Sequence, residues 1–291
     1  MPRPFFDRLE AHRRERASAL CVGIDPRLDR IPAALRSDDV ETTLTRFGLA
    51  VHERTAAHAA CWKPQIAFFE AHGVAGLKAY AAILRGIRAR GGLVIADAKR
   101  GDIGSTAEAY AEAFLAPGGD FEADALTVNP FLGRDALAPF IDAAVRHGKG
   151  LYVLVRTSNP GARDLQEHVL QSGERVFERV ARLVEELGAP SVSAESGWSA
   201  VGAVVGATSP EACEVLRTML PHTPFLVPGF GAQGATATDV APAFRADGSG
   251  AVVNASRSVI HPPVDDAAWP EAVTEAARAA SESIHAATVA S

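Results

Sequence analysis

Short apolar segments rich in β-branched residues alternate with longer segments of helical periodicity along the whole chain. The apolar segments predict eight strands, at 20–25, 60–64, 93–99, 123–129, 150–157, 201–208, 225–228 and 251–254. The segments between them, such as 72–90, 134–148 and 174–187, carry apolar residues at helical spacing. Apolar strands that alternate with helices are typical of a parallel sheet with right-handed crossovers. Eight such units favour a closed (β/α)8 barrel over an open sheet.

No linker or low-complexity segment interrupts this pattern. We therefore expect one domain, a single (β/α)8 TIM barrel over residues 1–291, with an alanine-rich C-terminal helix from about residue 267. The composition, 47% hydrophobic and 22% charged, is that of a folded globular protein and excludes disorder.

Charge and hydropathy narrow the class of protein further. A formal net charge of −6 produces a negative long-range electrostatic field, which does not favour binding to nucleic acid or to an anionic membrane surface. The arginine-rich N-terminal segment is unlike a signal peptide, and no apolar run reaches the roughly 18 residues that span a bilayer. We expect a cytoplasmic enzyme that binds neither nucleic acid nor membrane.

Cysteine and histidine spacing argues against a metal centre. Cys21, Cys61 and Cys213 lie far apart, which fits neither a disulfide framework nor a zinc site. The histidines show no metal-binding spacing either. We expect no bound metal.

Polar side chains follow every predicted strand, at the end of the barrel where catalytic residues are found in this fold. The densest group is Asp97, Lys99 and Asp102 after the third strand, with Lys63 ending the second. Alternation along a strand places Asp97 and Lys99 on the same side. An alternating Lys–Asp–Lys–Asp array is then geometrically possible.

Opposite charges about 4–6 Å apart hold each other ionised. Lys99 is therefore expected to stay an ammonium and to donate a proton, unlike the free-amine nucleophile of a Schiff-base aldolase. An ion-pair network that only stabilises the barrel rim is the structural alternative.

Glycines after the seventh strand indicate a phosphate site. Gly229, Gly231 and Gly234 surround Gln233, and glycine lets backbone N–H groups approach an anion closely. The eighth strand ends at Arg257, whose guanidinium suits phosphate, and barrels often bind phosphate after their last two strands.

The segment DAKRGDI at 97–103, followed by Thr106, resembles the DxKxxDI signature of the orotidine 5′-phosphate decarboxylase family. The segments VGIDP, KPQIAFFE, TSNPGA, VGAVVGAT, PGFGAQGA and NASRS extend the resemblance over the barrel, and the chain is most similar to the longer bacterial subgroup (type 2). The resemblance implies decarboxylation of orotidine 5′-phosphate to uridine 5′-phosphate (UMP) and CO₂, the last step of de novo UMP biosynthesis. It implies no metal and no organic cofactor.

The resemblance also implies roles for individual residues. It assigns the catalytic array to Lys63, Asp97, Lys99 and Asp102, with Lys99 as proton donor to C6. It assigns substrate binding to Asp25 with Lys63 at the ribose, Ser158 at the pyrimidine, and Gln233 with Arg257 at the 5′-phosphate. Asp102, Ile103 and Thr106 would reach into a partner subunit's site, which implies a homodimer with shared active sites. The segment 163–173 is longer than in shorter family members, and its part in closing a lid is not predicted.

Two other functions stay open. A Mg²⁺-dependent sugar-phosphate decarboxylase or synthase of the same superfamily shares part of the motif, but Lys63 and the TSN sequence at 157–159 count against it. A non-catalytic barrel that binds a phosphate metabolite is the other, although a buried charge array without a catalytic use is costly.

Overall fold

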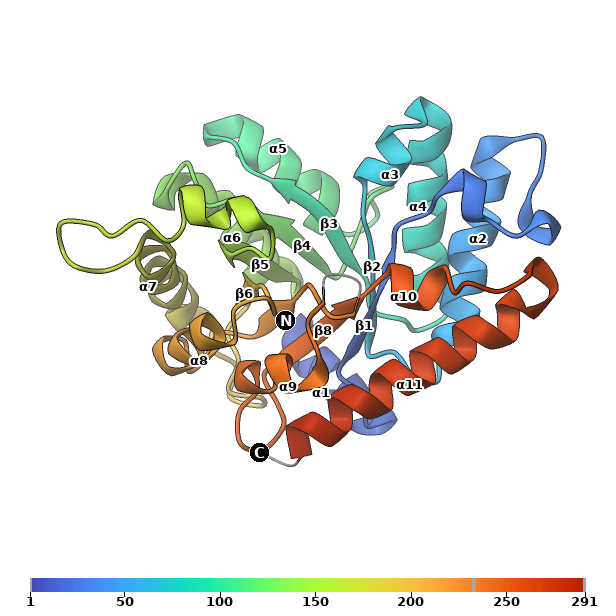
Figure 1. Ribbon diagram of the computed structural model, residues 1–291. Helices are drawn as coiled ribbons and strands as arrows, with labels where there is room; N and C mark the ends of the chain where they lie inside the picture. Colours follow the sequence, from blue (N-terminus) through green and yellow to red (C-terminus); the bar gives the residue numbers. More distant parts are fainter. Residues whose placement is uncertain (1, 232–233, 290–291) are drawn as a thin grey trace.

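Eight parallel strands form the centre of the computed structural model, which describes residues 2–231 and 234–289 (Figure 1). They are β1 (Leu20–Ile24), β2 (Cys61–Pro64), β3 (Ile95–Arg100), β4 (Ala125–Val128), β5 (Gly150–Arg156), β6 (Val201–Val205), β7 (Phe225–Val227) and β8 (Ala251–Ala255). The strand order is β2-β1-β8-β7-β6-β5-β4-β3, and bridges from Trp62 to Val94 and from Gln65 to Asp97 bring β2 against β3. The predicted (β/α)8 fold class is confirmed, with a strand in each predicted segment.

Helices cover the outside of this nearly closed barrel. They are α2 (Val40–Thr55), α3 (Ala67–Glu70), α4 (Gly73–Ala89), α5 (Gly104–Leu115), α6 (Arg134–His147), α7 (Val176–Gly188), α8 (Pro210–Met219), α9 (Ala237–Val240), α10 (Arg257–Ile260) and α11 (Trp269–Val289). In the described ranges, no helix is both long enough and apolar enough to cross a bilayer. The cytoplasmic location stays a prediction.

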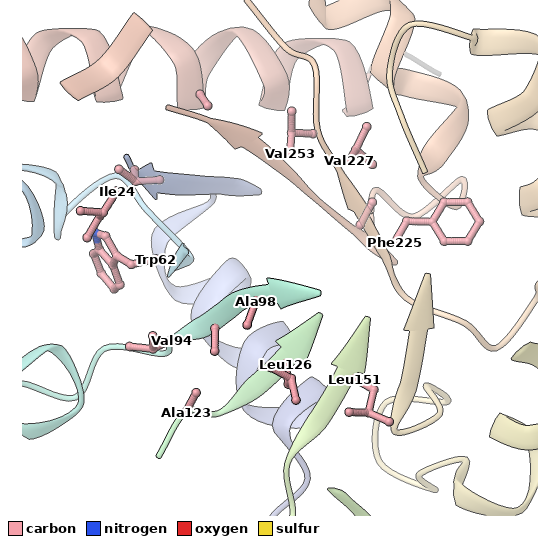
Figure 2. Packing of buried hydrophobic residues seen from close by; sticks show 14 of the residues in the cluster. Ile24, Trp62, Val94, Ala98, Ala123, Leu126, Leu151, Phe225, Val227 and Val253 are labelled. Atoms are coloured by element: carbon pink, nitrogen blue, oxygen red, sulfur yellow. The ribbon is translucent and has the colours of Figure 1, made fainter. Parts of the chain in front are cut away.

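The strands carry two apolar layers because alternate side chains point to opposite faces. The outer layer, between strands and helices, includes Ile24, Trp62 and Leu126 (Figure 2). The inner layer fills the N-terminal end of the barrel, which α1 (Phe5–Arg16) covers. There the rings of Phe6 and Tyr152 meet edge to face, with centroids 5.4 Å apart. This end is therefore sealed by apolar packing.

The barrel interior becomes polar toward the C-terminal ends of the strands. On β3 the inward positions run from Ile95 to Asp97, and on β4 from Ala125 to Thr127. Lys63 on β2 is also buried in the interior. Strand alternation thus places charged groups on one rim, opposite the end that α1 closes.

A separate ion-pair cluster lies at the N-terminal end. Glu122 binds Lys149 and Arg88, with oxygen-to-nitrogen distances of 2.7 and 2.5 Å. Burial alone would raise the pKa of Glu122, but hydrogen bonds from Lys149 and the Gly118 N–H lower it to about 2. This cluster fastens the start of β5 to the segment before β4.

Candidate active site

Three charged side chains meet inside the C-terminal mouth of the barrel. The Asp97 carboxylate binds Lys63 Nζ through Oδ2 at 2.5 Å and Lys99 Nζ through Oδ1 at 2.6 Å. Lys63 and Asp97 are buried, whereas the Lys99 side chain is 46% exposed. The structure thus brings together three of the four residues of the expected array.

Burial and charge act in opposite directions on these groups. Burial favours the neutral form of Asp97, but the ammonium groups of Lys63 and Lys99 hold the pKa of that carboxyl well below its usual range. Burial likewise disfavours the charged form of Lys63, but Asp97 and Asp25 raise its pKa above its usual range. The cluster is therefore an ion triad.

The backbone of β3 departs from a regular strand at Lys99. This residue has φ +48°, in the left-handed region, and the pairing of β3 with β4 shifts register between Ala96 and Arg100. The contact with Asp97 predicted from simple alternation exists, but a left-handed kink produces it. Non-glycine residues in this region are uncommon and are often found at functional sites.

Thr127 is a site residue that the sequence reasoning missed. Its buried Oγ1 accepts the N–H groups of Ala98 and Lys99 at 3.0 and 2.9 Å, and it donates to Asp97 Oδ1 at 3.1 Å. The alternation of side chains along β4 indicates that Thr127 points into the barrel, because it lies two positions after the inward-facing Ala125.

Asp25 lies beyond the end of β1, close enough to Lys63 for their charges to interact. Its Oδ1 atom is buried and lacks a hydrogen-bond partner among the described residues. Burial raises the pKa of Asp25, and the charge of Lys63 partly opposes this effect. Gly23 permits the close approach of β8 here, since a Cβ atom would lie 1.8 Å from Ser256 Oγ. Asp25 therefore offers an unused acceptor at the mouth.

Asp102 does not join the ion triad within this chain. Its Oδ1 accepts the N–H of Ile103 at 2.8 Å, and no ion pair links it to Lys99 in residues 2–231 and 234–289. Ile103 is 58% exposed, and Thr106 is exposed in the first turn of α5. Of the three residues expected at a partner's site, Ile103 and Thr106 are thus exposed, and Asp102 is half-buried.

Ser158 follows β5, and the segment 163–173 is fastened beside it. Gln166 accepts the N–H of Thr157 through Oε1 and donates to Thr157 Oγ1 through Nε2, both at 2.8 Å. Arg156 binds Glu167 at 2.6 Å. The rest of the loop before α7 projects away from the barrel, at the left of Figure 1. This segment therefore braces the polypeptide around Ser158.

The expected phosphate-binding residues follow β7 and β8. Gly229 and Gly231 have φ +109° and +71°, conformations that glycine adopts at little cost. A Cβ atom on Gly231 would lie 3.3 Å from Ser258 Oγ, so this turn lies against the start of α10. Arg257 is exposed there and makes no ion pair within the part of the chain that the structure describes. Gln233 lies outside the described residues.

Comparison with known proteins assigns this chain to a family. Residues 18–272 match the family model described as orotidine 5′-phosphate decarboxylase / HUMPS family. A relative from Rhodopirellula baltica named orotidine 5′-phosphate decarboxylase is 42% identical, over 94% of this chain and 96% of its own. One of the same name from Deinococcus radiodurans is 46% identical over 84% of each chain.

A solved structure agrees with these relatives. OMP decarboxylase from Leishmania donovani shares 34% identity and superposes with a TM-score of 0.78, over 99% of this chain and 100% of that one. The resemblance identified in the sequence is confirmed. The chain belongs to the orotidine 5′-phosphate decarboxylase / HUMPS family.

Proposed function

We propose that this protein decarboxylates orotidine 5′-phosphate to UMP and CO₂, with Lys99 Nζ donating the proton to C6. The observation that carries the proposal is the ion triad of Lys63, Asp97 and Lys99 at the mouth of the barrel. Relatives with 42% and 46% identity that bear the name of this enzyme support it.

The chemistry requires a fixed positive charge beside C6. When the bond from C6 to the carboxylate breaks, its electron pair stays on C6, where the pyrimidine ring cannot delocalise it. An ammonium held next to C6 stabilises this charge and then transfers its proton, and water later returns a proton to the amine. Asp97 holds Lys99 in position beforehand, and such preorganised charge is usually a large part of catalysis.

The substrate-binding roles that the resemblance implies are supported by the residues around the triad. The unpartnered Oδ1 of Asp25 suits a ribose hydroxyl, which would donate a hydrogen bond to it. Ser158 lies at the end of β5 and would contact the pyrimidine. Arg257, with Gln233, would bind the 5′-phosphate, because its exposed guanidinium has no carboxylate partner among the described residues and could pair with the phosphate.

A second copy of the chain would complete each site. The exposed Ile103 and Thr106 and the half-buried Asp102 would reach the triad of the partner, which would make a homodimer the working unit. Exposed apolar side chains beside them favour an interface, since Phe131 is 77% and Leu132 47% exposed after the neighbouring strand β4. Two-fold symmetry would then supply the same three residues to both sites.

The two other functions fit the site less well. A Mg²⁺-dependent sugar-phosphate enzyme would use carboxylates to hold the ion, whereas both oxygens of Asp97 here bind ammonium groups. A barrel that only binds a metabolite has no evident use for a proton donor at its mouth.

One experiment separates these three functions. The purified protein is mixed with orotidine 5′-phosphate, and the loss of substrate absorbance and the formation of UMP are followed with and without EDTA. We expect UMP formation at equal rates in both samples. A rate abolished by EDTA and restored by Mg²⁺ would favour the metal-dependent alternative, and nucleotide binding without turnover would favour the binding barrel.

A further inference from the structure

The hydroxyl group of Thr127 joins the kinked backbone of β3 to the carboxylate of the ion triad. Thr127 is 1% exposed and lies on β4, which runs beside β3 in the barrel (Figure 2). Its Oγ1 contacts three groups of β3: the N–H of Ala98, the N–H of Lys99 and Oδ1 of Asp97. One buried side chain from β4 therefore contacts both the backbone of β3 and the carboxylate of Asp97.

The hydrogen-bond capacity of a hydroxyl fixes the direction of these contacts. A threonine hydroxyl has two lone pairs and one hydrogen. The N–H groups of Ala98 and Lys99 occupy the lone pairs, at 3.0 and 2.9 Å. The hydrogen is left for Asp97 Oδ1 at 3.1 Å, since the Ala96 carbonyl is more distant at 3.5 Å. The hydroxyl can only donate to Asp97, so it favours the ionised carboxylate.

The same contacts stabilise the conformation of Lys99. A residue with a Cβ atom is disfavoured at φ +48° and needs support from its surroundings. At this kink the backbone pairing of β3 with β4 is interrupted, between Ala96 and Arg100. The side-chain oxygen of Thr127 accepts the N–H groups of Ala98 and Lys99 there. A buried N–H without an acceptor would destabilise the kink.

We propose that Thr127 is a positioning residue for the decarboxylation. Its hydroxyl holds Lys99 in the left-handed conformation and orients Asp97, and together these contacts aim Lys99 Nζ at the reacting carbon. Thr127 acts through Asp97 and Lys99. This inference rests on the proposed function, because it assumes that Lys99 delivers the proton.

The test compares two substitutions at Thr127 with one elsewhere. Thr127→Val keeps the shape and removes the hydroxyl, whereas Thr127→Ser keeps the hydroxyl. The control is Thr223→Val, because Thr223 is also buried and its hydroxyl also donates to a carboxylate, Glu185, at 2.8 Å outside the site. Kinetic constants, the Kd for UMP and thermal unfolding are measured for all three variants.

A misaligned proton donor lowers the rate without weakening nucleotide binding. We expect Thr127→Val to lower kcat about 100-fold, the size of effect that a 1 Å misplacement produces. KM and the Kd for UMP should stay within about threefold of wild type, and Thr127→Ser should recover most of kcat. Thr223→Val should lose stability but keep its kcat. Should the valine variant fail to fold, Thr127→Ala replaces it.

Crystal structures of wild type and Thr127→Val supply a readout independent of activity. We expect Lys99 to leave the left-handed region, or its Nζ to leave Asp97, in the variant. A valine variant with wild-type kcat, or with Lys99 and Asp97 unmoved, would overturn the inference while the proposed function stands. Wild-type protein without activity on orotidine 5′-phosphate would instead refute the proposed function, and the two crystal structures would still decide whether Thr127 holds the kink.

Discussion

Lys63 and Lys99 bind opposite oxygens of the same carboxylate, that of Asp97. The two lysines differ in burial, because the Lys63 side chain is 6% exposed and the Lys99 side chain 46%. Lys63 therefore acts as a fixed counter-charge inside the barrel, while Lys99 presents its ammonium where a bound substrate can reach it. This difference predicts that a substitution at Lys99 acts on turnover.

Lys99→Ala should abolish turnover and leave nucleotide binding largely intact. General acids contribute about 10²–10⁴-fold to rate, and here the same group also stabilises the carbanion, so we expect a loss at or beyond the upper value. Steady-state assays with orotidine 5′-phosphate and calorimetry with UMP measure the two effects. Lys78→Ala is the matched control, since Lys78 is a 65% exposed lysine on the outer helix α4. A Lys99→Ala variant that keeps a tenth of the wild-type rate would exclude the proton-donor role.

Periodicity accounts for most of the fold and part of the site. The alternation of apolar and helical segments predicted a strand at each observed position. The positions of the strand ends predicted that Lys63, Asp97 and Lys99 lie at one rim, although the contact of Lys99 with Asp97 occurs at a kink and not in a regular strand. These features depend on residues close in sequence or on the geometry shared by all such barrels.

Other features of the site depend on contacts that no sequence period encodes. The role of Thr127 arises from a register shift between two strands, and a left-handed residue at Lys99 is not visible in its neighbours. The hydrogen bonds between Gln166 and Thr157 join an irregular loop to the end of a strand. In the proposed shared site, the position of Asp102 relative to Lys99 would depend on a second chain, so the sequence of one chain would not determine it.

Gln166→Leu should weaken pyrimidine binding. The substitution removes both hydrogen bonds to Thr157 and loosens the chain next to Ser158. The two lost hydrogen bonds contribute about 1 kcal/mol each, and the remaining contact between Arg156 and Glu167 offsets part of this loss. We therefore expect the KM for orotidine 5′-phosphate to rise about tenfold. A variant in the projecting part of the same loop, Val169→Ser, is the control, because Val169 is 68% exposed. Equal KM values for both variants and wild type would argue against a bracing role.

Glu122 should make the stability of the barrel depend on pH at the end opposite the site. Its pKa is lowered from 4.5 to about 2 by its hydrogen bonds, so its ion pairs stabilise the fold fully above pH 4.5. That contribution to stability is lost as the pH falls from 4.5 through about 2. Glu122→Gln should therefore have a lower Tm than wild type at pH 7, and its Tm should fall less between pH 7 and pH 3.

Calorimetry at several pH values measures this difference, with Glu53→Gln as the control because Glu53 is exposed on α2. The control should follow the wild-type pH dependence. Coincident Tm curves for Glu122→Gln and wild type would show that the ion pairs of Glu122 add nothing to stability. Activity at pH 7 should be unchanged, since the triad lies at the other end of the barrel.

Arg257→Ala should weaken the binding of phosphorylated ligands selectively. A lost charge-assisted hydrogen bond costs about 1.5–3 kcal/mol, which corresponds to roughly 10- to 150-fold in the Kd for UMP. The Kd for uridine, which lacks the phosphate, should hardly change. Equal losses for UMP and uridine would mean that Arg257 supports the structure and does not bind phosphate.

The proposed shared site predicts that two inactive variants restore each other's activity. Lys99→Ala and Asp102→Ala homodimers should both be nearly inactive, because every site in them lacks one essential group. When subunits exchange, a heterodimer places both substitutions in one site and leaves the other site wild type. Random exchange of equal amounts makes half of the dimers hybrid, each with one good site, so about a quarter of wild-type activity should return. Two differently tagged Lys99→Ala proteins, mixed in the same way, should stay inactive. If purified heterodimers are as inactive as their parents, Asp102 serves the site of its own chain and the assignment to the partner's site is wrong.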